Sequence, residues 1–245
     1  LNNEQLMVHH PLGDPSYSNL KSIHEFSIRA KDLVKMLLAY ARQQTFKREV
    51  FAVTDFMSEF SILLRQLLDE RIELDVKHGR DVPYIKADKN QLENALFNLA
   101  TNARDAMLSH KNGGKLTIRT ARATGKEAQD KGFAFVSDGD YMLIEVEDSG
   151  HGMPKDVMDK IFQPFFTTKE AGVGTGLGLA TVYGIIKQSG GYICTTSSVG
   201  KGTTFHIYLP ALKAEEIPEP VDMAQAEKIA SQPVDISGRG RILLI

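Results

Sequence analysis

Residues 172–180 of this 245-residue chain read GVGTGLGLA, with a glycine at every second position from 172 to 178. A run of this kind lets the backbone approach a ligand closely, and here it leads directly into an apolar helical pattern. The exposed N–H groups at a helix N-terminus suit phosphate oxygens. The run therefore indicates a phosphate-binding loop, with a flexible surface turn as the alternative.

This loop matches neither of the two common nucleotide-binding motifs. In the pattern GxGxxG, the residue three positions after Gly176 would have to be glycine, and position 179 is leucine. The P-loop pattern GxxxxGK[ST] requires a lysine directly after its second glycine, and no lysine follows these glycines. The motifs therefore exclude a Rossmann-type site and a P-loop at this position.

A second pattern, YMLIEVEDSGHGM at residues 141–153, ends a predicted strand with a carboxylate. The apolar residues of one strand face are Met142, Ile144 and Val146. By the alternation of side chains along a strand, Asp148 lies on that same buried face, where a carboxylate needs a partner. An adenine amino group is one such partner, with Gly150 and Gly152 allowing a base to approach closely. The alternative is an Asx turn, in which Asp148 bonds to its own backbone.

The third pattern is a stripe of asparagines on a predicted helix over residues 87–108. Asn94, Asn98 and Asn102 step by four and share one helical face. The apolar residues lie on the other face: Leu92, Leu96, Leu99, Ala103 and Ala106. Asparagine is a mediocre helix former, and its neutral amide oxygen is a hard ligand that suits Mg²⁺. The stripe predicts a Mg²⁺ site that depends on triphosphate charge, with a solvated polar face as the alternative.

The elements around these patterns predict an α+β fold. Apolar periodicity marks further helices at residues 58–70 and 176–190. Alternation marks strands at residues 71–78, 115–120, 140–148, 191–198 and 202–210. Over residues 47–212 we expect a two-layer α/β sandwich, with helices on a mixed sheet, preceded by a partial helical hairpin over residues 1–46.

Composition narrows the class of protein. A formal net charge of −2 argues against a nucleic-acid partner. The single cysteine, Cys194, excludes an internal disulfide and a cysteine zinc cluster, fits a reducing cytoplasm, and is expected to be a small buried residue. No stretch approaches about 18 uninterrupted apolar residues. We therefore expect a cytoplasmic chain that reaches a membrane only through other parts of a longer protein.

Together the motifs resemble the ATP-binding domain of bacterial sensor histidine kinases, within the fold shared by gyrase, Hsp90 and MutL ATPases. Five segments carry the resemblance, in the family's order over about residues 50–210: QLENALFNLATNARDAM, DSGHGM, KIFQPFFTTK, GTGLGLA and GKGTTFHIYLP. The resemblance implies that ATP and Mg²⁺ are the cofactors. It also implies that the intact protein transfers the γ-phosphoryl group of ATP to a histidine in a two-component phosphorelay.

For the adenine end of ATP, the resemblance implies that Asp148 holds the amino group in a pocket shaped by Gly150, Gly152 and Thr203. For the phosphate end, it implies that Asn102 ligates Mg²⁺ and Asn98 positions the phosphates. The lid and its hinge would comprise Gly174, Thr175, Gly176, Leu177 and Gly178.

Lys169, in the segment FTTK, could neutralise charge on the γ-phosphate. The alternative is an exposed lysine of the lid. With Asn98 and Asn102, Lys169 completes the set of residues that we expect to act in phosphoryl transfer by position and charge.

Residues 1–46 would be a remnant of the dimerisation and histidine-phosphotransfer hairpin. The family's acceptor motif is H-[DE]-x-x-N. No acid follows His9 or His10, and His24 is followed by an acid but has Ile28 where asparagine is expected. We interpret His24 as an exposed helix residue and expect a fragment that binds ATP but cannot phosphorylate itself. Its partner would be the phosphoacceptor helix of the same kinase dimer.

The other end of the chain resembles a hybrid kinase. Residues 213–237 are acidic and contain proline, as is typical of a linker. Residues 238–245, GRGRILLI, resemble the first strand of a truncated receiver domain. The implied partners are that receiver domain in cis and a downstream phosphotransfer protein.

Several segments are similar to a hybrid kinase of the bacterial cell cycle, which implies cyclic di-GMP as a second ligand favouring phosphatase activity. Tyr183 and Lys187 lie one helical turn apart, and Tyr192 and Ile193 begin the next strand. These residues could stack on a guanine and meet a phosphate. The alternative is a lysine with an apolar stem beside surface tyrosines.

Two other functions remain as alternatives. One is an ATPase coupled to conformational change, like gyrase, MutL or Hsp90, against which the helical hairpin, the acidic linker and the RILLI strand count. The other is a non-catalytic module that senses nucleotide. Loss of Asn102 or Asp148 would have indicated such a module, and both residues are present.

Overall fold

The computed structural model describes residues 16–24, 26–27, 47–109, 113–169 and 174–216. Residues 16–24 and 26–27 are helical, whereas most of the predicted hairpin, most of the linker and the RILLI segment lie outside the described residues. Contacts divide the chain into one unit of residues 1–212 and another of residues 213–245. In the second unit, Ala214–Glu216 form a short 3₁₀ helix.

The first unit contains the helices and strands that carry the predicted site. They are β1 (Glu49–Ala52), α3 (Val53–Leu67), β2 (Ile72–His78), β3 (Tyr84–Ala87), α4 (Lys89–Leu108), β4 (Gly114–Thr124), α5 (Gly125–Asp130), β5 (Asp140–Asp148), α6 (Lys155–Met158), α7 (Gly178–Gln188), β6 (Tyr192–Ser198) and β7 (Gly202–Pro210). The sequence analysis predicted most of these elements within a few residues but not β1, β3, α5 or α6.

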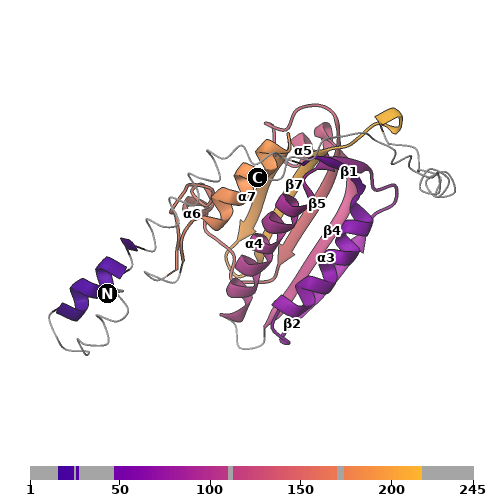
Figure 1. Ribbon diagram of the computed structural model, residues 1–245. Helices are drawn as coiled ribbons and strands as arrows, with labels where there is room; N and C mark the ends of the chain where they lie inside the picture. The colour runs from indigo at the N-terminus through magenta and orange to yellow at the C-terminus, as the bar shows by residue number, and fades with distance from the viewer. Residues whose placement is uncertain (1–15, 25, 28–46, 110–112, 170–173, 217–245) are drawn as a thin grey trace, which may run out of the picture. The chain divides into compact units, whose positions relative to one another are not determined.

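Five strands form a mixed sheet in the order β2-β4-β5-β7-β6, and helices α3, α4 and α7 cover one of its faces (Figure 1). Strand β2 runs parallel to β4, and the remaining neighbours are antiparallel. Strands β1 and β3 form a separate antiparallel pair. The predicted two-layer α+β sandwich is therefore confirmed.

The main core lies between the sheet and these three helices. Strand β5 contributes Met142, Ile144 and Val146, as its alternation predicts, and all three are at most 2% exposed. Helix α4 contributes mainly Leu92, Leu96, Leu99 and Ala103. The carboxylate of Asp88 caps this helix by accepting a hydrogen bond from the backbone N–H of Gln91 at 3.1 Å. Burial of one face of α4 leaves its asparagine stripe directed away from the core.

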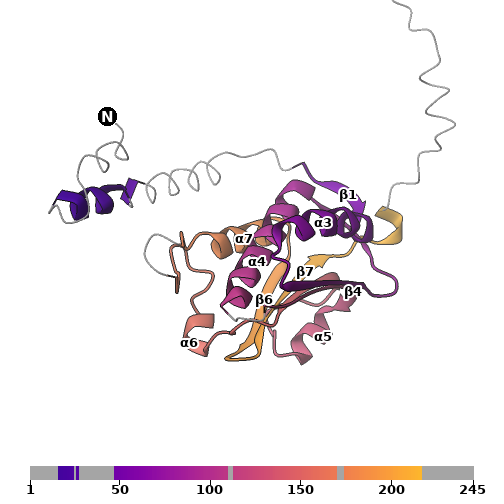
Figure 2. The same cartoon turned by 90° about the horizontal axis from the view of Figure 1, so that it is seen from below.

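The opposite face of the sheet carries a second, smaller core that the sequence analysis did not predict. Figure 2 shows α5 on this side of the sheet, away from α3 and α4. The buried residues of the second core are Ala123, Ala128, Phe133, Val136, Tyr141, Leu143, Cys194 and Tyr208. Cys194 is buried, as predicted, and burial raises the pKa of its thiol to about 12. This thiol therefore stays protonated near neutral pH.

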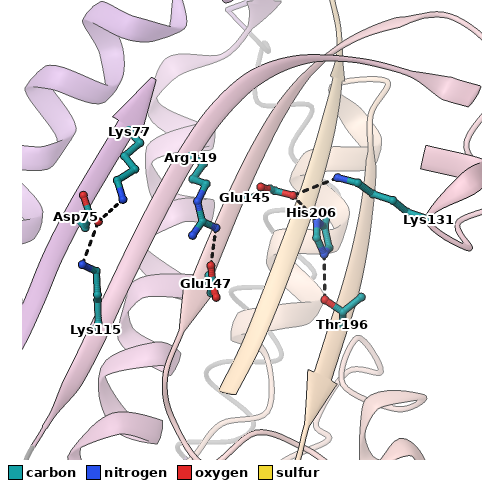
Figure 3. Close-up of polar contacts among 9 residues, drawn as sticks. All are labelled: Asp75, Lys77, Lys115, Arg119, Lys131, Glu145, Glu147, Thr196 and His206. Carbon is teal, nitrogen blue, oxygen red and sulfur yellow. Dashed lines mark hydrogen bonds and ion pairs between the residues drawn. The ribbon is translucent and has the colours of Figure 1, made fainter. Parts of the chain in front are cut away.

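Charged side chains occupy the rest of that face (Figure 3). The ion pairs join Asp75 to Lys77 and Lys115, Arg119 to Glu147, and Glu145 to Lys131. His206 also forms a hydrogen bond with Glu145. The hydrogen bond between Glu145 and His206, 3.0 Å long, is the main reason that the pKa of Glu145 lies below its ordinary value. The solvent-exposed pairs among these contribute little to the stability of the fold, so the main core provides most of it.

Candidate functional site

Helix α4 aligns the predicted asparagines on one stripe. The Asn98 side-chain amide donates to the Asn94 backbone oxygen at 2.9 Å and to Asn94 Oδ1 at 3.1 Å. This arrangement leaves Asn98 Oδ1 directed toward the first turn of α7, where a Cβ on Gly178 would lie only 3.1 Å from it. Gly178 therefore allows the N-terminus of α7 to reach the asparagine stripe, where its free N–H groups suit phosphate.

Asn102 lies one turn further along α4 and is half-buried. Its side-chain amide forms no hydrogen bond within the described part of the chain, so it needs water or a ligand. No group of three or more His, Cys, Asp or Glu side chains among the described residues could hold a metal ion. A metal here would depend on the neutral oxygen of Asn102 and on the charge of a bound phosphate, which fits the predicted Mg²⁺ site.

Asp148 is the buried carboxylate at the end of β5. Asp148 is only 5% exposed, and its Oδ1 accepts a hydrogen bond from the Gly150 N–H at 2.8 Å. The Asx turn that was the alternative interpretation is thus present. Burial raises the pKa of Asp148, although the N–H groups of Gly150 and Thr203 partly oppose the rise. A carboxylate can accept about four hydrogen bonds, so the Asx turn is compatible with an adenine amino group as a further partner.

Strands β6 and β7 complete this end of the site. Thr203 lies opposite Asp148 in the β5–β7 ladder. Its hydroxyl lies 3.0 Å from that of Ser197, which also donates to the Gly202 oxygen and accepts from the Met153 N–H. A cavity of about 210 Å³ at this end of the sheet touches Asp148 and Thr203, but Glu147, Thr196 and Thr204 also line it and no residue of α4 does. Because side chains alternate along a strand, Glu147 faces the side of the sheet away from α4, so this cavity does not extend to the asparagine stripe.

The two glycines after Asp148 allow the loop after β5 to pack closely against α4 on one side and the β6–β7 hairpin on the other. Gly150 packs on α4, since a Cβ there would lie 2.7 Å from the Cβ of Ala106. Gly152 has a φ of +67° and packs against the β6–β7 hairpin, where a Cβ would lie 2.0 Å from the Ser198 oxygen. The loop after β5 is therefore held within one turn of Asn102.

Residues 174–178, the predicted lid and hinge, are bonded to the segment around Phe165 that precedes them in the chain. The Phe165 N–H donates to the Gly176 oxygen at 2.9 Å. Both residues have positive φ, +68° for Phe165 and +67° for Gly176, and such strain in a bulky residue is concentrated at functional sites. Leu177 is buried, and its N–H donates to the Thr175 hydroxyl at 3.4 Å. Gly172 and Val173 of the glycine run lie outside the described residues.

Lys169 does not project freely from the loop. Its Nζ lies 2.5 Å from Oδ2 of Asp105, and the two side chains are 36% and 32% exposed. Lys169 is exposed, as the alternative interpretation expects, but the ion pair with Asp105 holds its ammonium group. Burial alone would raise the pKa of Asp105, but hydrogen bonds from Lys169 and Arg104 hold it below its ordinary value.

Known proteins match this chain in sequence and in fold. The sequence profile of a family described as histidine kinase-, DNA gyrase B- and HSP90-like ATPases matches residues 87–213, more than half of the chain. The chain belongs to this ATPase family. The catalytic domain of the histidine kinase ThkA has the same fold, with a TM-score of 0.53 and 26% identity over 67% of this chain and 96% of that domain.

Two curated relatives of this ATPase-family chain are bacterial kinases. The sensor kinase CckA of Brucella abortus (strain 2308) is 44% identical over the whole chain, which covers 26% of that protein. Sporulation kinase E of Bacillus subtilis (strain 168) is 34% identical over 77% of the chain and 23% of that protein. The chain therefore spans about a quarter of the length of these relatives.

Three of the four residues predicted for a second ligand lie together, apart from the asparagine stripe. Lys187 Nζ lies 5.5 Å from the ring centroid of Tyr183 and 4.6 Å from that of Tyr192. Ile193 is only 4% exposed and packs in the main core. Its side chain is therefore not available at this surface, which corrects its assignment as a possible ligand contact.

The sequence did not predict the supporting roles of three side chains at the site. Asn94 orients the amide of Asn98, Ser197 joins Thr203 to the loop after β5, and Asp105 pairs with Lys169. Asn94 belongs to the asparagine stripe, so its spacing could have indicated this role. The other two contacts join elements that are distant in sequence, and no local pattern marks them.

Replacing Asp148 with asparagine should raise the melting temperature of the nucleotide-free protein at pH 7.5 by a few degrees. Because burial raises the folded-state pKa of this carboxyl group, its charged form destabilises the fold above that pKa. The stabilisation of Asp148→Asn over wild type should shrink as the pH falls through the raised pKa, and vanish below the ordinary value of about 3.9.

Thermal unfolding across this pH range is the measurement, with the exposed Asp130→Asn as the matched control. The control should change the melting temperature little at any pH. A melting temperature of Asp148→Asn at or below that of wild type at pH 7.5 would contradict the assignment of Asp148 as a destabilising buried charge.

Proposed function

We propose that the chain binds MgATP between α4 and the ends of β5 and β7, as the catalytic domain of a hybrid sensor histidine kinase. The observation that carries the proposal is that the buried Asp148 carboxylate lies close to the asparagine stripe of α4. Gly150 makes this possible, because it lets the loop after β5 pack directly against the helix. A buried hydrogen-bond acceptor for a base and hard neutral oxygens for a metal-bound phosphate are the two recognition elements that MgATP requires.

At the adenine end, Asp148 accepts a hydrogen bond from the exocyclic amino group while the Asx turn with Gly150 fixes the carboxylate. Thr203, with its hydroxyl held by Ser197, forms the neighbouring wall. A charge-assisted hydrogen bond in a buried site contributes about 1.5–3 kcal/mol. Asp148 thereby selects a base with an amino group at this position.

At the phosphate end, Asn102 provides the oxygen for Mg²⁺ and Asn98 orients the phosphates beside the first turn of α7. Mg²⁺, when bound, neutralises the charge of the triphosphate. The flank of the lid, Gly174 to Gly178, borders this region, and Lys169 adds a positive charge near the γ-phosphate. These groups hold and orient the phosphates, and position is the main requirement of phosphoryl transfer.

The whole protein would transfer the γ-phosphoryl group to a histidine on the dimerisation helix of the same kinase dimer. It would then pass the group to a receiver domain in cis and to a downstream phosphotransfer protein. The names of the two curated relatives, a sensor kinase and a sporulation kinase, support a kinase over a gyrase-, MutL- or Hsp90-like conformational ATPase. The presence of both Asn102 and Asp148 argues against a non-catalytic nucleotide sensor.

The cellular setting is also a proposal. No helix among the described residues is long and apolar enough to cross a membrane. We propose that the chain is the cytoplasmic portion of an inner-membrane kinase, which is the arrangement that the family resemblance implies.

Calorimetric titration with ATP tests the proposal. Wild type should bind ATP in the micromolar range with Mg²⁺, and Asp148→Ala should weaken binding about tenfold or more because the amino group loses a charged partner. Asn102→Ala should chiefly remove the dependence on Mg²⁺. A folded wild type that binds no ATP, or an Asp148→Ala variant of unchanged affinity, would contradict the adenine assignment.

We also propose cyclic di-GMP as a regulatory ligand that shifts the balance from kinase toward phosphatase. The supporting observation is the contact of Lys187 with the rings of Tyr183 and Tyr192. Tyr183 is 40% exposed, so its ring is available to stack on a guanine, while Lys187 is close enough to meet a phosphate.

Titration of cyclic di-GMP into wild type should give a saturable binding signal that Tyr183→Ala weakens about tenfold, as the loss of one stacked base contact implies. Tyr84→Ala removes a tyrosine of similar exposure, 39%, on β3 and should leave the affinity unchanged. The absence of binding by wild type, or equal losses in the two variants, would end this proposal.

A further inference from the structure

Asp105 and Lys169 form an ion pair that joins α4 to the segment before the lid. The residues are 64 positions apart in the chain, and Nζ of Lys169 lies 2.5 Å from Oδ2 of Asp105. Asp105 follows Asn102 by three residues, so the two side chains lie on neighbouring positions of one helical face. The pair therefore places the lysine ammonium beside the amide that is proposed to hold Mg²⁺.

The stem of Lys169 is held as well as its charge. A Cβ on Gly174 would lie 2.5 Å from the Thr167 hydroxyl and 3.1 Å from Cβ of Lys169. The Thr167 hydroxyl also accepts a hydrogen bond from the Lys169 backbone N–H at 3.1 Å. The lysine is thus confined at its backbone by Thr167, along its stem by Gly174 and at its ammonium group by Asp105.

This arrangement still leaves donors for a ligand. A lysine ammonium has three N–H donors, and Asp105 is the one acceptor that it meets among the described residues. Asp105 itself is shared with Arg104, whose guanidinium lies 3.0 Å from Oδ1. Oδ1 thus faces Arg104 and Oδ2 faces Lys169, so the carboxylate is compensated and does not present an unpaired negative charge to an incoming triphosphate.

We propose that Asp105 is a positioning residue that holds the Lys169 ammonium ready for the γ-phosphate of ATP. This inference rests on the proposed ATP-binding function. Lysine has a long, flexible stem, and fixing it before the nucleotide arrives removes an ordering cost from the binding step. The ammonium keeps its bond to Asp105 and directs its other donors to the phosphate. ADP lacks that phosphate and gains nothing from the arrangement.

Calorimetry of the chain with MgATP and MgADP tests the inference. Asp105→Asn should weaken MgATP binding about two- to tenfold, the range expected when one flexible side chain must be ordered on binding, and should change MgADP binding less than about twofold. Lys169→Met should likewise lose affinity for MgATP selectively. In the Lys169→Met background, Asp105→Asn should cause no further change in the ratio of the two affinities.

Two controls separate positioning from a general structural role. Asp105→Glu retains a carboxylate and should recover part of the preference for MgATP. Arg104→Gln removes the other cation on Asp105 but leaves Lys169 in place, so it should reduce the preference for MgATP much less than Asp105→Asn does. Thermal unfolding of each variant shows whether the fold is intact.

The inference would be overturned if Asp105→Asn weakened the binding of MgATP and MgADP equally. It would also be overturned if Asp105→Asn strengthened MgATP binding, because that result would mean that Asp105 competes with the phosphate for Lys169. An effect of Asp105→Asn that persisted without Lys169 would also overturn it. A folded wild type that binds neither nucleotide would overturn the proposed function and this inference together. Binding of both nucleotides with an unchanged ratio in Asp105→Asn would overturn the inference alone.

Discussion

The approach of neighbouring backbone to helix α4 is the constraint that shapes the candidate site. At Gly150 a Cβ would lie 2.7 Å from that of Ala106, and at Gly178 it would lie 3.1 Å from Asn98 Oδ1. Any larger side chain at either position would push the loop after β5, or the start of α7, away from the asparagine stripe. The site is thus positioned by packing on a helix whose other face is buried in the main core, and such rigid support gives precise geometry.

That precision has a cost in the nucleotide-free protein. Asp148 is almost fully buried, and no lysine or arginine among the described residues forms an ion pair with it. Phe165 adopts a left-handed backbone conformation while its side chain remains 46% exposed. A buried charge at Asp148 and local strain at Phe165, both in segments of the candidate site, indicate a site arranged for a ligand, because stability alone would favour neither. The main core around β5 and α4 supplies the stability that offsets them.

The sequence could predict the elements that have a clear period. The alternation of Met142, Ile144 and Val146 marked the buried face of β5, and four-residue spacing marked the asparagine face of α4. The second core could not be predicted, since Ala128, Phe133 and Val136, which cover the strand residues of that core, have no regular apolar spacing. The pair of Asp105 and Lys169 joins positions 64 residues apart, and only the folded chain brings them together.

Ile193 shows a different limit of sequence reasoning. It follows Tyr192 directly at the start of one strand, which suggests a shared role, yet adjacent strand residues point to opposite faces of a sheet. Ile193 accordingly packs in the main core while Tyr192 contacts Lys187. The alternation of side chains along a strand is therefore enough to assign the two residues to different surroundings.

The central claim is that Asp148 recognises the amino group of adenine while α4 holds the phosphates. The most direct test compares the affinity of the wild-type chain for MgATP and MgGTP by calorimetry, because the two carry the same triphosphate. Guanine has a carbonyl oxygen where adenine has the amino group, so the buried carboxylate should favour MgATP about tenfold or more. Equal affinities would show that the base is not recognised by Asp148 and would contradict the account.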